Sequence, residues 1–246
     1  MARFYLPKAK IQDKKASLEG SELEHMRTVL RLKPGQSVIL FDDDAWEHEA
    51  KISSYGDRSA ELEILKSYQP ERESPLEVTL AQAVGKGEKM DWVVEKSTEL
   101  GVHAILPFFS SYTVPRFDSD KTDKRRLRWE KIALGAVKQS GRTRIPKILE
   151  LTSFDELVQR PWSCELKLIF CPGEFNINIK HVKEERPLVT SMLLVIGPEG
   201  GLTSEEVLQA EGQGFQTVHL GQRILRTETA AVGALSIVQL LWGDLG

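Results

Sequence analysis

The chain has 246 residues, 41% hydrophobic and 28% charged, which is typical of a globular protein with one large or two modest domains. No apolar run reaches the length of a membrane span, and the first ten residues lack the hydrophobic stretch of a signal peptide, so we expect a cytoplasmic protein without membrane contact. The two cysteines, Cys164 and Cys171, lack the paired short spacing of zinc and redox motifs, and the five histidines are scattered. No metal centre is expected.

Charge is distributed unevenly along the chain. The net charge is −3, yet residues 121–147 hold ten Lys or Arg against two acids, and residues 1–35 hold eight against four. A single basic run is most often a solvated helix face. Two such segments in an otherwise acidic chain favour a polyanion partner, because each neutralised phosphate releases counterions.

The first 72 residues are predicted to form a small β-barrel. Apolar and polar positions alternate in short runs over residues 37–65, with turn residues at Pro34 and Gly35 and again at Tyr55 to Asp57. A first strand is expected at residues 3–6, followed by a short helix that a capping box between Ser21 and Glu24 opens. The polar stretch 69–75 separates this part from the rest, so we place a domain boundary after residue 72.

Residues 73–246 alternate predicted strands with predicted helices. The strands are expected at 76–84, 102–109, 166–170, 192–196 and 217–220. The helices are expected at 89–101, 124–139, from a cap at Thr203 to Gly214, and at 227–242. Regular alternation of this kind predicts an α/β fold with a parallel sheet covered on both faces.

Two of these strands end in glycine loops that predict a ligand site. The strand ending at Ile196 is followed by the sequence GPEGG (197–201), and the strand ending at Leu220 by Gly221 and then a helix. Such loops gather backbone N–H groups at the carboxyl edge of a parallel sheet, where open α/β sheets bind ligands. The spacings of the two common phosphate loops are absent, and Glu199 would repel a pyrophosphate. A neutral or cationic adenosine compound is therefore favoured over an anionic nucleotide.

An ordered set of motifs resembles a known family. The motifs are KG (86–87), EKSTELGV (95–102), QSGR (139–142), IGPEGG (196–201) and LGQRILRTETA (220–230). The chain resembles RsmE, the 16S ribosomal RNA uridine-N3 methyltransferase family of the SPOUT superfamily. This resemblance covers nearly the whole chain. It implies a SPOUT parallel sheet tied into a C-terminal trefoil knot, a PUA-like RNA-binding barrel at residues 1–72, and a homodimer that acts on 16S ribosomal RNA in the small subunit.

The resemblance also implies the residues of the site. S-adenosyl-L-methionine would lie in the knot. Its adenine ring would occupy an apolar slot, and the polar edge of this ring would face the backbone of the glycine loops. The implied cofactor residues are Phe170, Ile196, Gly197, Pro198, Glu199, Gly200, Gly201, Leu220, Gly221, Ile224, Leu225 and Thr227. Candidate RNA contacts are Arg3, His25, Arg27, Arg31 and Lys86.

Methylation of uridine N3 requires removal or stabilisation of the proton that this nitrogen carries. Glu228 is a candidate general base, although helix capping or an ion pair with Arg226 would also explain a carboxylate at this position. Arg226 or Arg142 is a candidate for stabilising the uracil anion, and either would also suit a phosphate contact.

Three other functions remain open at this point. They are methylation of another RNA uridine or of a ribose, RNA binding without catalysis, and a small-molecule reaction that uses a nucleotide. The second gives no reason for the paired glycine loops, and the third gives none for the charge asymmetry. Lys96 and Glu99 belong to a family-like motif, but their spacing predicts an ion pair on a helix surface.

Overall fold

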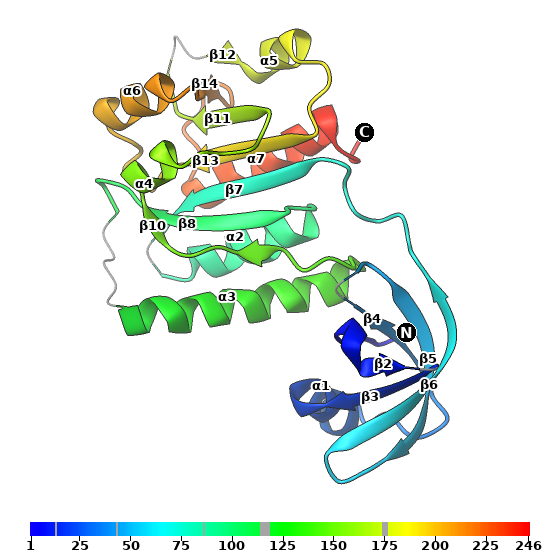
Figure 1. The fold of residues 1–246 in the computed structure, drawn as a ribbon. Helices are drawn as coiled ribbons and strands as arrows, with labels where there is room; N and C mark the ends of the chain where they lie inside the picture. Colours follow the sequence, from blue (N-terminus) through cyan, green and yellow to red (C-terminus); the bar gives the residue numbers. More distant parts are fainter. Residues whose placement is uncertain (13, 43, 86, 114–118, 174–176) are drawn as a thin grey trace. The chain divides into compact units, whose positions relative to one another are not determined.

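The computed structural model describes the chain except residues 13, 43, 86, 114–118 and 174–176. The chain forms two compact units (Figure 1). One comprises Met1–Glu73 together with Val137–Ile145, and the other comprises Ser74–Ala136 together with Pro146–Gly246.

The N-terminal unit is built on a six-stranded sheet. Its order is β1 (Arg3–Tyr5), β4 (Ser37–Phe41), β5 (Glu47–Tyr55), β6 (Ser59–Tyr68), β3 (Lys15–Glu19) and β2 (Ile11–Gln12). The β1–β4 pair is parallel and the other pairs are antiparallel. Between the described residues of β1 and β2 no pairing closes the sheet, so the predicted barrel takes the form of a half-barrel. Alternate residues such as Leu40 and Ile52 point inward and form its apolar core.

The helical segment of this unit begins differently from the prediction. Helix α1 (Gly20–Glu24) follows β3 directly, its N-cap is Glu19, and no side chain caps it, so the predicted capping box is wrong. Gly20 has φ +62 and turns the chain immediately after the strand, which leaves Ser21 inside the helix instead of at its cap. The chain continues as a π-helical turn, η2 (His25–Val29), and a 3-10 turn, η1 (Lys8–Lys10), follows β1.

The C-terminal unit contains the predicted parallel sheet. Its order is β10 (Thr152–Ser153), β8 (Ala104–Phe109), β7 (Glu77–Ala83), β13 (Ser191–Ile196), β11 (Leu166–Phe170), β14 (Gln216–His219) and β12 (Ile177–Asn178), with β9 (Lys147–Ile148) beside β8. Every pairing in it is parallel. The central strands read as continuous apolar runs because both faces of the sheet are covered.

Two apolar cores cover the two faces of this sheet. The first core contains residues of α2 (Lys89–Glu99), α3 (Ser119–Ser140), α5 (Ile179–Glu185) and α7 (Thr227–Trp242). The second core contains residues of α4 (Phe154–Gln159) and α6 (Ser204–Gly212). The predicted cap of α6 is confirmed, because Thr203 and Glu206 form a reciprocal capping box. Helix α3 begins five residues earlier than predicted, and α7 has the predicted bounds.

The strand register brings the glycine loops together. Phe170 is paired with Ile196 on one side and with Val218 on the other. The strands β11, β13 and β14 therefore end at almost the same level of the sheet. The chain segments that follow them lie at one edge, and this edge carries the candidate site.

Candidate functional site

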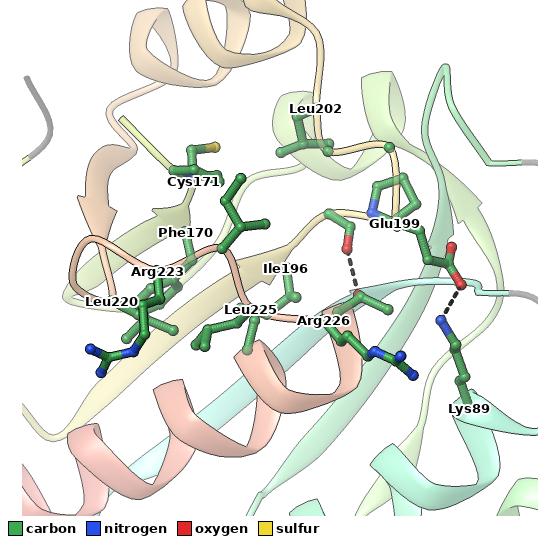
Figure 2. Close-up of a pocket in the computed structure, with 18 of the residues that line it drawn as sticks. Lys89, Phe170, Cys171, Ile196, Glu199, Leu202, Leu220, Arg223, Leu225 and Arg226 are labelled. Atoms are coloured by element: carbon green, nitrogen blue, oxygen red, sulfur yellow. Dashed lines mark hydrogen bonds and ion pairs between the residues drawn. The ribbon is translucent and has the colours of Figure 1, made fainter. Parts of the chain in front are cut away.

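A cavity of about 550 Å³ opens at the carboxyl edge of β11, β13 and β14 (Figure 2). Its volume lies within the range of pockets that hold small molecules and cofactors. The cavity is lined by all twelve residues that the resemblance implied for the cofactor, namely Phe170, Ile196, Gly197, Pro198, Glu199, Gly200, Gly201, Leu220, Gly221, Ile224, Leu225 and Thr227.

The wall formed by the glycine loop depends on missing side chains. A Cβ atom at Gly200 would lie 3.0 Å from the Cβ of Tyr112, and one at Gly197 would lie 3.0 Å from the Cγ of Leu202. Gly201 has φ +75 and Gly221 has φ +89, in the left-handed region that favours glycine. The backbone of both loops therefore follows a path that larger residues would distort.

An apolar slot lies between the loops. Phe170 and Ile196 are buried at the ends of their strands, and Leu220 and Leu225 converge with them in Figure 2. Ile224 also lines the cavity but is 84% exposed, so it lies at the mouth and outside the core. A slot of this kind suits a flat, largely apolar ring system.

Buried hydrogen bonds hold the start of α7 against the first glycine loop. The hydroxyl of Thr227 donates to the carbonyl of Gly197 at 2.6 Å and accepts from Nε2 of Gln82 at 2.9 Å. Both Gln82 and Thr227 are buried, and Gln82 is the register partner of Ile196. Because these bonds are buried, they set the spacing of β7, β13 and α7 beneath the cavity.

A lysine lies between two carboxylates at the rim of the cavity. Nζ of Lys89 lies 2.8 Å from Oε1 of Glu199 and 3.5 Å from Oε2 of Glu228. The hydrogen bond to Glu199 raises the pKa of Lys89, although partial burial opposes this effect. Among the described residues the ion-pair partner of Glu228 is thus Lys89, and the alternative pairing with Arg226 is not formed.

The three candidate catalytic residues do not all lie in one unit. Arg226 lines the cavity, and Glu228 follows it in the first turn of α7. Arg142 belongs to the N-terminal unit, where its buried guanidinium donates to Glu73 from Nε at 3.1 Å and from Nη2 at 2.7 Å. Burial alone would raise the pKa of Glu73, but hydrogen bonds from Arg142 and from two backbone amides hold it below its usual range.

The candidate RNA contacts differ in how accessible they are. Arg3 is engaged within its own unit: it pairs with Glu47, donates to the carbonyl of Arg142 at 2.7 Å and lies 5.1 Å from the ring of Phe41. Its guanidinium supports the packing of the half-barrel.

Three of the other candidates, His25, Arg27 and Arg31, lie on or just after the π-helical turn. Arg27 and Arg31 are exposed, and Arg31 has φ 52, which is uncommon for a residue with a side chain. The ring of His25 packs edge-on against Phe4 at 5.8 Å. Lys86 lies outside the described residues.

The structure adds residues that sequence reasoning missed. They are Lys89, Cys171, Pro172, Leu202, Arg223 and Ala230, all of which line the cavity. Some of these residues could have been predicted from the topology of the sheet. In a parallel sheet the segments that follow β7 and β11 lie at the same edge as the glycine loops. The predicted surface pair of Lys96 and Glu99 is confirmed at 2.8 Å.

The described part of the chain offers neither a metal-binding cluster nor a membrane-spanning helix. No three His, Cys, Asp or Glu residues there gather closely enough to hold a metal ion. No helix within it combines the length and hydropathy required to cross a membrane.

Family models match both parts of the chain. Residues 72–239 match an RNA methyltransferase domain, and residues 18–65 match an RNA methyltransferase PUA domain. The ribosomal RNA small subunit methyltransferase E of Bacillus subtilis is 34% identical, with 99% of this chain and 100% of that protein covered. The protein of the same name from Buchnera aphidicola subsp. Schizaphis graminum is 33% identical, with 93% of this chain and 92% of that protein covered.

Solved structures resemble the whole chain. The ribosomal RNA small subunit methyltransferase E of Neisseria gonorrhoeae, solved bound to S-adenosyl methionine, superimposes with a TM-score of 0.89 at 35% identity over 100% of both chains. A methyltransferase from Legionella pneumophila, solved with the bound cofactor SAM, has a TM-score of 0.91 at 36% identity over 99% of both chains. The chain therefore belongs to the RsmE family of ribosomal RNA small subunit methyltransferases, with a PUA domain followed by a SPOUT-type methyltransferase domain.

Proposed function

We propose that this protein transfers a methyl group from S-adenosyl-L-methionine to N3 of a uridine in 16S ribosomal RNA. The observation that carries this proposal is the cavity between the two glycine loops, in a chain whose relatives of solved structure hold that cofactor in complexes. The small ribosomal subunit would be the substrate particle, and the cytoplasm would be the place of action.

The residues of the cavity fit this cofactor. The apolar slot of Phe170, Ile196 and Leu225 suits an adenine ring, and the backbone of the glycine loops offers hydrogen bonds to its edge. The carboxylate of Glu199, which would repel a phosphate, suits a ligand that carries positive charge. When bound, S-adenosylmethionine supplies an electrophilic methyl group on a sulfonium sulfur.

The side chains near the cavity suggest how the proton on N3 is handled. N3 lies on the pairing edge, so the uridine must be unpaired when the enzyme binds it. We assign Glu228 as the base that accepts the N3 proton. The freed electron pair then forms the nitrogen–carbon bond, while the pair of the broken carbon–sulfur bond stays on sulfur. Arg226, at the cavity wall, would stabilise the negative charge that develops on the uracil oxygens.

Arg142 has a weaker case for a catalytic role. Its guanidinium is committed to Glu73 within the N-terminal unit, so stabilisation of the uracil anion would compete with that ion pair. We retain the catalytic role as a hypothesis, and the stability of the Glu73→Gln variant tests the structural alternative.

The remaining parts of the proposal concern RNA and assembly. The PUA domain would bind RNA phosphates through Arg27 and Arg31, and the basic residues of α3 would also bind RNA phosphates. A homodimer and a trefoil knot around α7 are expected from the SPOUT resemblance. Sedimentation would report the dimer, because a monomeric mass at micromolar concentration would contradict it.

One experiment tests the reaction directly. The protein is incubated with labelled S-adenosylmethionine and small ribosomal subunits that lack the modification, and the methyl group is then mapped on the RNA. We expect a single N3-methyluridine in 16S RNA, and a parallel incubation with naked 16S RNA identifies the preferred substrate. Label on a ribose or on another RNA would favour a different methyltransferase. RNA binding without transfer would favour a non-catalytic RNA-binding protein.

A further inference from the structure

The charged residues that line the cavity have mixed signs. In the described part of its wall, Glu199 is the only carboxylate, while Lys89, Arg223 and Arg226 are basic. The proposed cofactor carries a positive sulfonium, whereas the product left after methyl transfer carries a neutral thioether. A carboxylate that acts on this one charge would therefore distinguish the cofactor from the product.

Lys89 already has two acceptors within reach. Its ammonium is hydrogen-bonded to Glu199 at 2.8 Å and lies 3.5 Å from Oε2 of Glu228. That oxygen of Glu228 is buried and has no hydrogen-bond partner in the described structure. A small movement of the lysine side chain toward Glu228 would weaken its own hydrogen bond to Glu199 and satisfy the buried oxygen. Such a movement exchanges the hydrogen bond to Glu199 for one to Glu228, and a positive ligand beside Glu199 would compensate for the lost contact.

The Lys89 and Glu199 pair is seated against the loop after β7. A Cβ atom at Gly85 would lie 3.1 Å from Oε1 of Glu199 and 3.5 Å from Cδ of Lys89. The missing side chain at Gly85 thus leaves the space that both partners occupy. Figure 2 shows Lys89 reaching from the start of α2 toward Glu199 at the rim of the cavity.

We propose that Glu199 and Lys89 together set the preference of the pocket for the cofactor over the demethylated product. The positive cofactor takes the place of the ammonium beside Glu199, and Lys89 turns toward Glu228. Once the methyl group has left, the sulfur is neutral, Lys89 returns to Glu199 and the product loses an attractive contact. Lys89 competes with the cofactor in this scheme, so it acts as a specificity residue.

The proposal makes opposite predictions for the two partners. We expect Glu199→Gln to weaken binding of S-adenosylmethionine about three- to tenfold and to change binding of S-adenosylhomocysteine less than about twofold. We expect Lys89→Met to increase the affinity for S-adenosylmethionine relative to the affinity for S-adenosylhomocysteine by about two- to fivefold, since a competing cation is removed. These sizes are modest because each side chain is about one-third exposed and water screens the charges.

Calorimetry with each ligand gives the two dissociation constants. The decisive readout is the dissociation constant of S-adenosylhomocysteine divided by that of S-adenosylmethionine, which measures the preference for the cofactor. Lys96→Met is the matched control, because Lys96 pairs with Glu95 and Glu99 at 2.8 Å on the same helix and does not line the cavity. It should leave the ratio unchanged. Thermal unfolding of each variant checks that it is folded.

The possible outcomes separate this inference from the proposed function on which it rests. If the folded wild-type protein does not bind S-adenosylmethionine, the proposed function fails. If it binds, but Glu199→Gln weakens both ligands equally, Glu199 only shapes the loop and the inference is overturned. A Lys89→Met variant whose ratio equals that of the wild type, or falls below it, also overturns the inference.

Discussion

Single glycines decide where the backbone can approach a ligand. Gly200 is packed against Tyr112, and its backbone forms part of the cavity wall. The side chain of a larger residue at this position would have to displace Tyr112 or project into the cavity. The shape of the cavity at this position thus depends on an absent side chain.

Gly200→Val should weaken cofactor binding strongly. Its branched side chain would meet Tyr112, where even a Cβ atom has only 3.0 Å of space, so the loop must shift into the cavity. We expect the dissociation constant of S-adenosylmethionine to rise at least about tenfold in calorimetry, which corresponds to about 1.4 kcal/mol. Gly212→Ala is the control, because a Cβ atom there meets nothing within 4 Å. An unchanged constant for Gly200→Val would argue against this pocket.

Glu228→Gln tests the assignment of the base. The amide keeps the shape of the side chain but cannot accept the N3 proton, so we expect turnover to fall by about 10² to 10⁴. Cofactor affinity should fall far less than turnover, because Glu228 does not line the cavity and affects the ligand only through Lys89. The exposed Glu205, in the first turn of α6, provides a control as Glu205→Gln. Near-normal turnover of Glu228→Gln with saturating RNA would rule out this role.

Cys171 lines the cavity but should react slowly at neutral pH. Burial raises the pKa of its thiol to about 11, and Glu211 and Glu206 add to this effect. Only the thiolate is nucleophilic, so alkylation by iodoacetamide in a Cys164→Ser background should accelerate about tenfold per pH unit between pH 8 and 10. Mass spectrometry measures the rate. A fast reaction at pH 7 that is independent of pH would contradict the protonated thiol.

At the scale of elements, the segment after α3 is joined to the half-barrel by one largely buried ion pair and by hydrogen bonds to backbone atoms. Arg142 and the backbone amides of Thr143 and Arg144 all donate to Glu73, and Arg72 donates to the carbonyl of Gly141. The family-like QSGR motif thus has a structural role within the N-terminal unit. This role explains Gly141 and Arg142 without an appeal to catalysis.

Glu73→Gln should reduce stability and flatten its dependence on acid pH. The pKa of Glu73 is lowered in the folded state, so its stabilisation is complete above the unfolded value near 4.5 and is lost as the pH falls through the folded value. We expect the free energy of unfolding at pH 7 to fall by about 2–4 kcal/mol, since Arg142 is left buried without its carboxylate. Urea titrations at pH 7 and pH 3.5 measure both effects.

The exposed Glu71 is the control for this experiment, and Glu71→Gln should change neither quantity appreciably. Equal stability of Glu73→Gln and wild type at pH 7 would contradict the structural role. The catalytic hypothesis for Arg142 would then gain weight, and Arg142→Ala would have to lower turnover without lowering stability.

At the scale of the whole molecule, the charge asymmetry should govern RNA binding. The basic positions of α3 include Lys124 and Lys131, which are exposed and make no ion pair in the described structure. Phosphate contacts release counterions, so affinity for 16S RNA should fall steeply with salt.

Replacing both lysines by glutamine should lower the slope of log Kd against log salt by about one to two units. Filter binding between about 50 and 300 mM salt measures the slope. Lys180→Gln, an exposed lysine of α5, is the control and should leave the slope unchanged. An unaltered slope in the double variant would place RNA elsewhere on the protein.

Much of the C-terminal unit was predictable because its strands are buried on both faces. The short apolar runs ending at Phe170 and Ile196 are typical of central strands. Thr203 and Glu206 have the spacing of a capping box, which predicts the start of α6. The half-barrel was less predictable, since Ser21 and Glu24 satisfy the pattern of a capping box while Gly20 moves the helix start. A local pattern failed there because the preceding strand decided where the helix begins.

The sequence by itself determined the family, the parallel sheet and the residues of the glycine loops, because these depend on local patterns and on order along the chain. Tertiary structure alone decided that Lys89 lies between Glu199 and Glu228, and that Arg142 is bound by Glu73. These pairs join residues 69 to 139 positions apart, and no local pattern encodes such separations. The strand register and the packing of helices on the sheet bring them together, and the charges of the site follow from that packing.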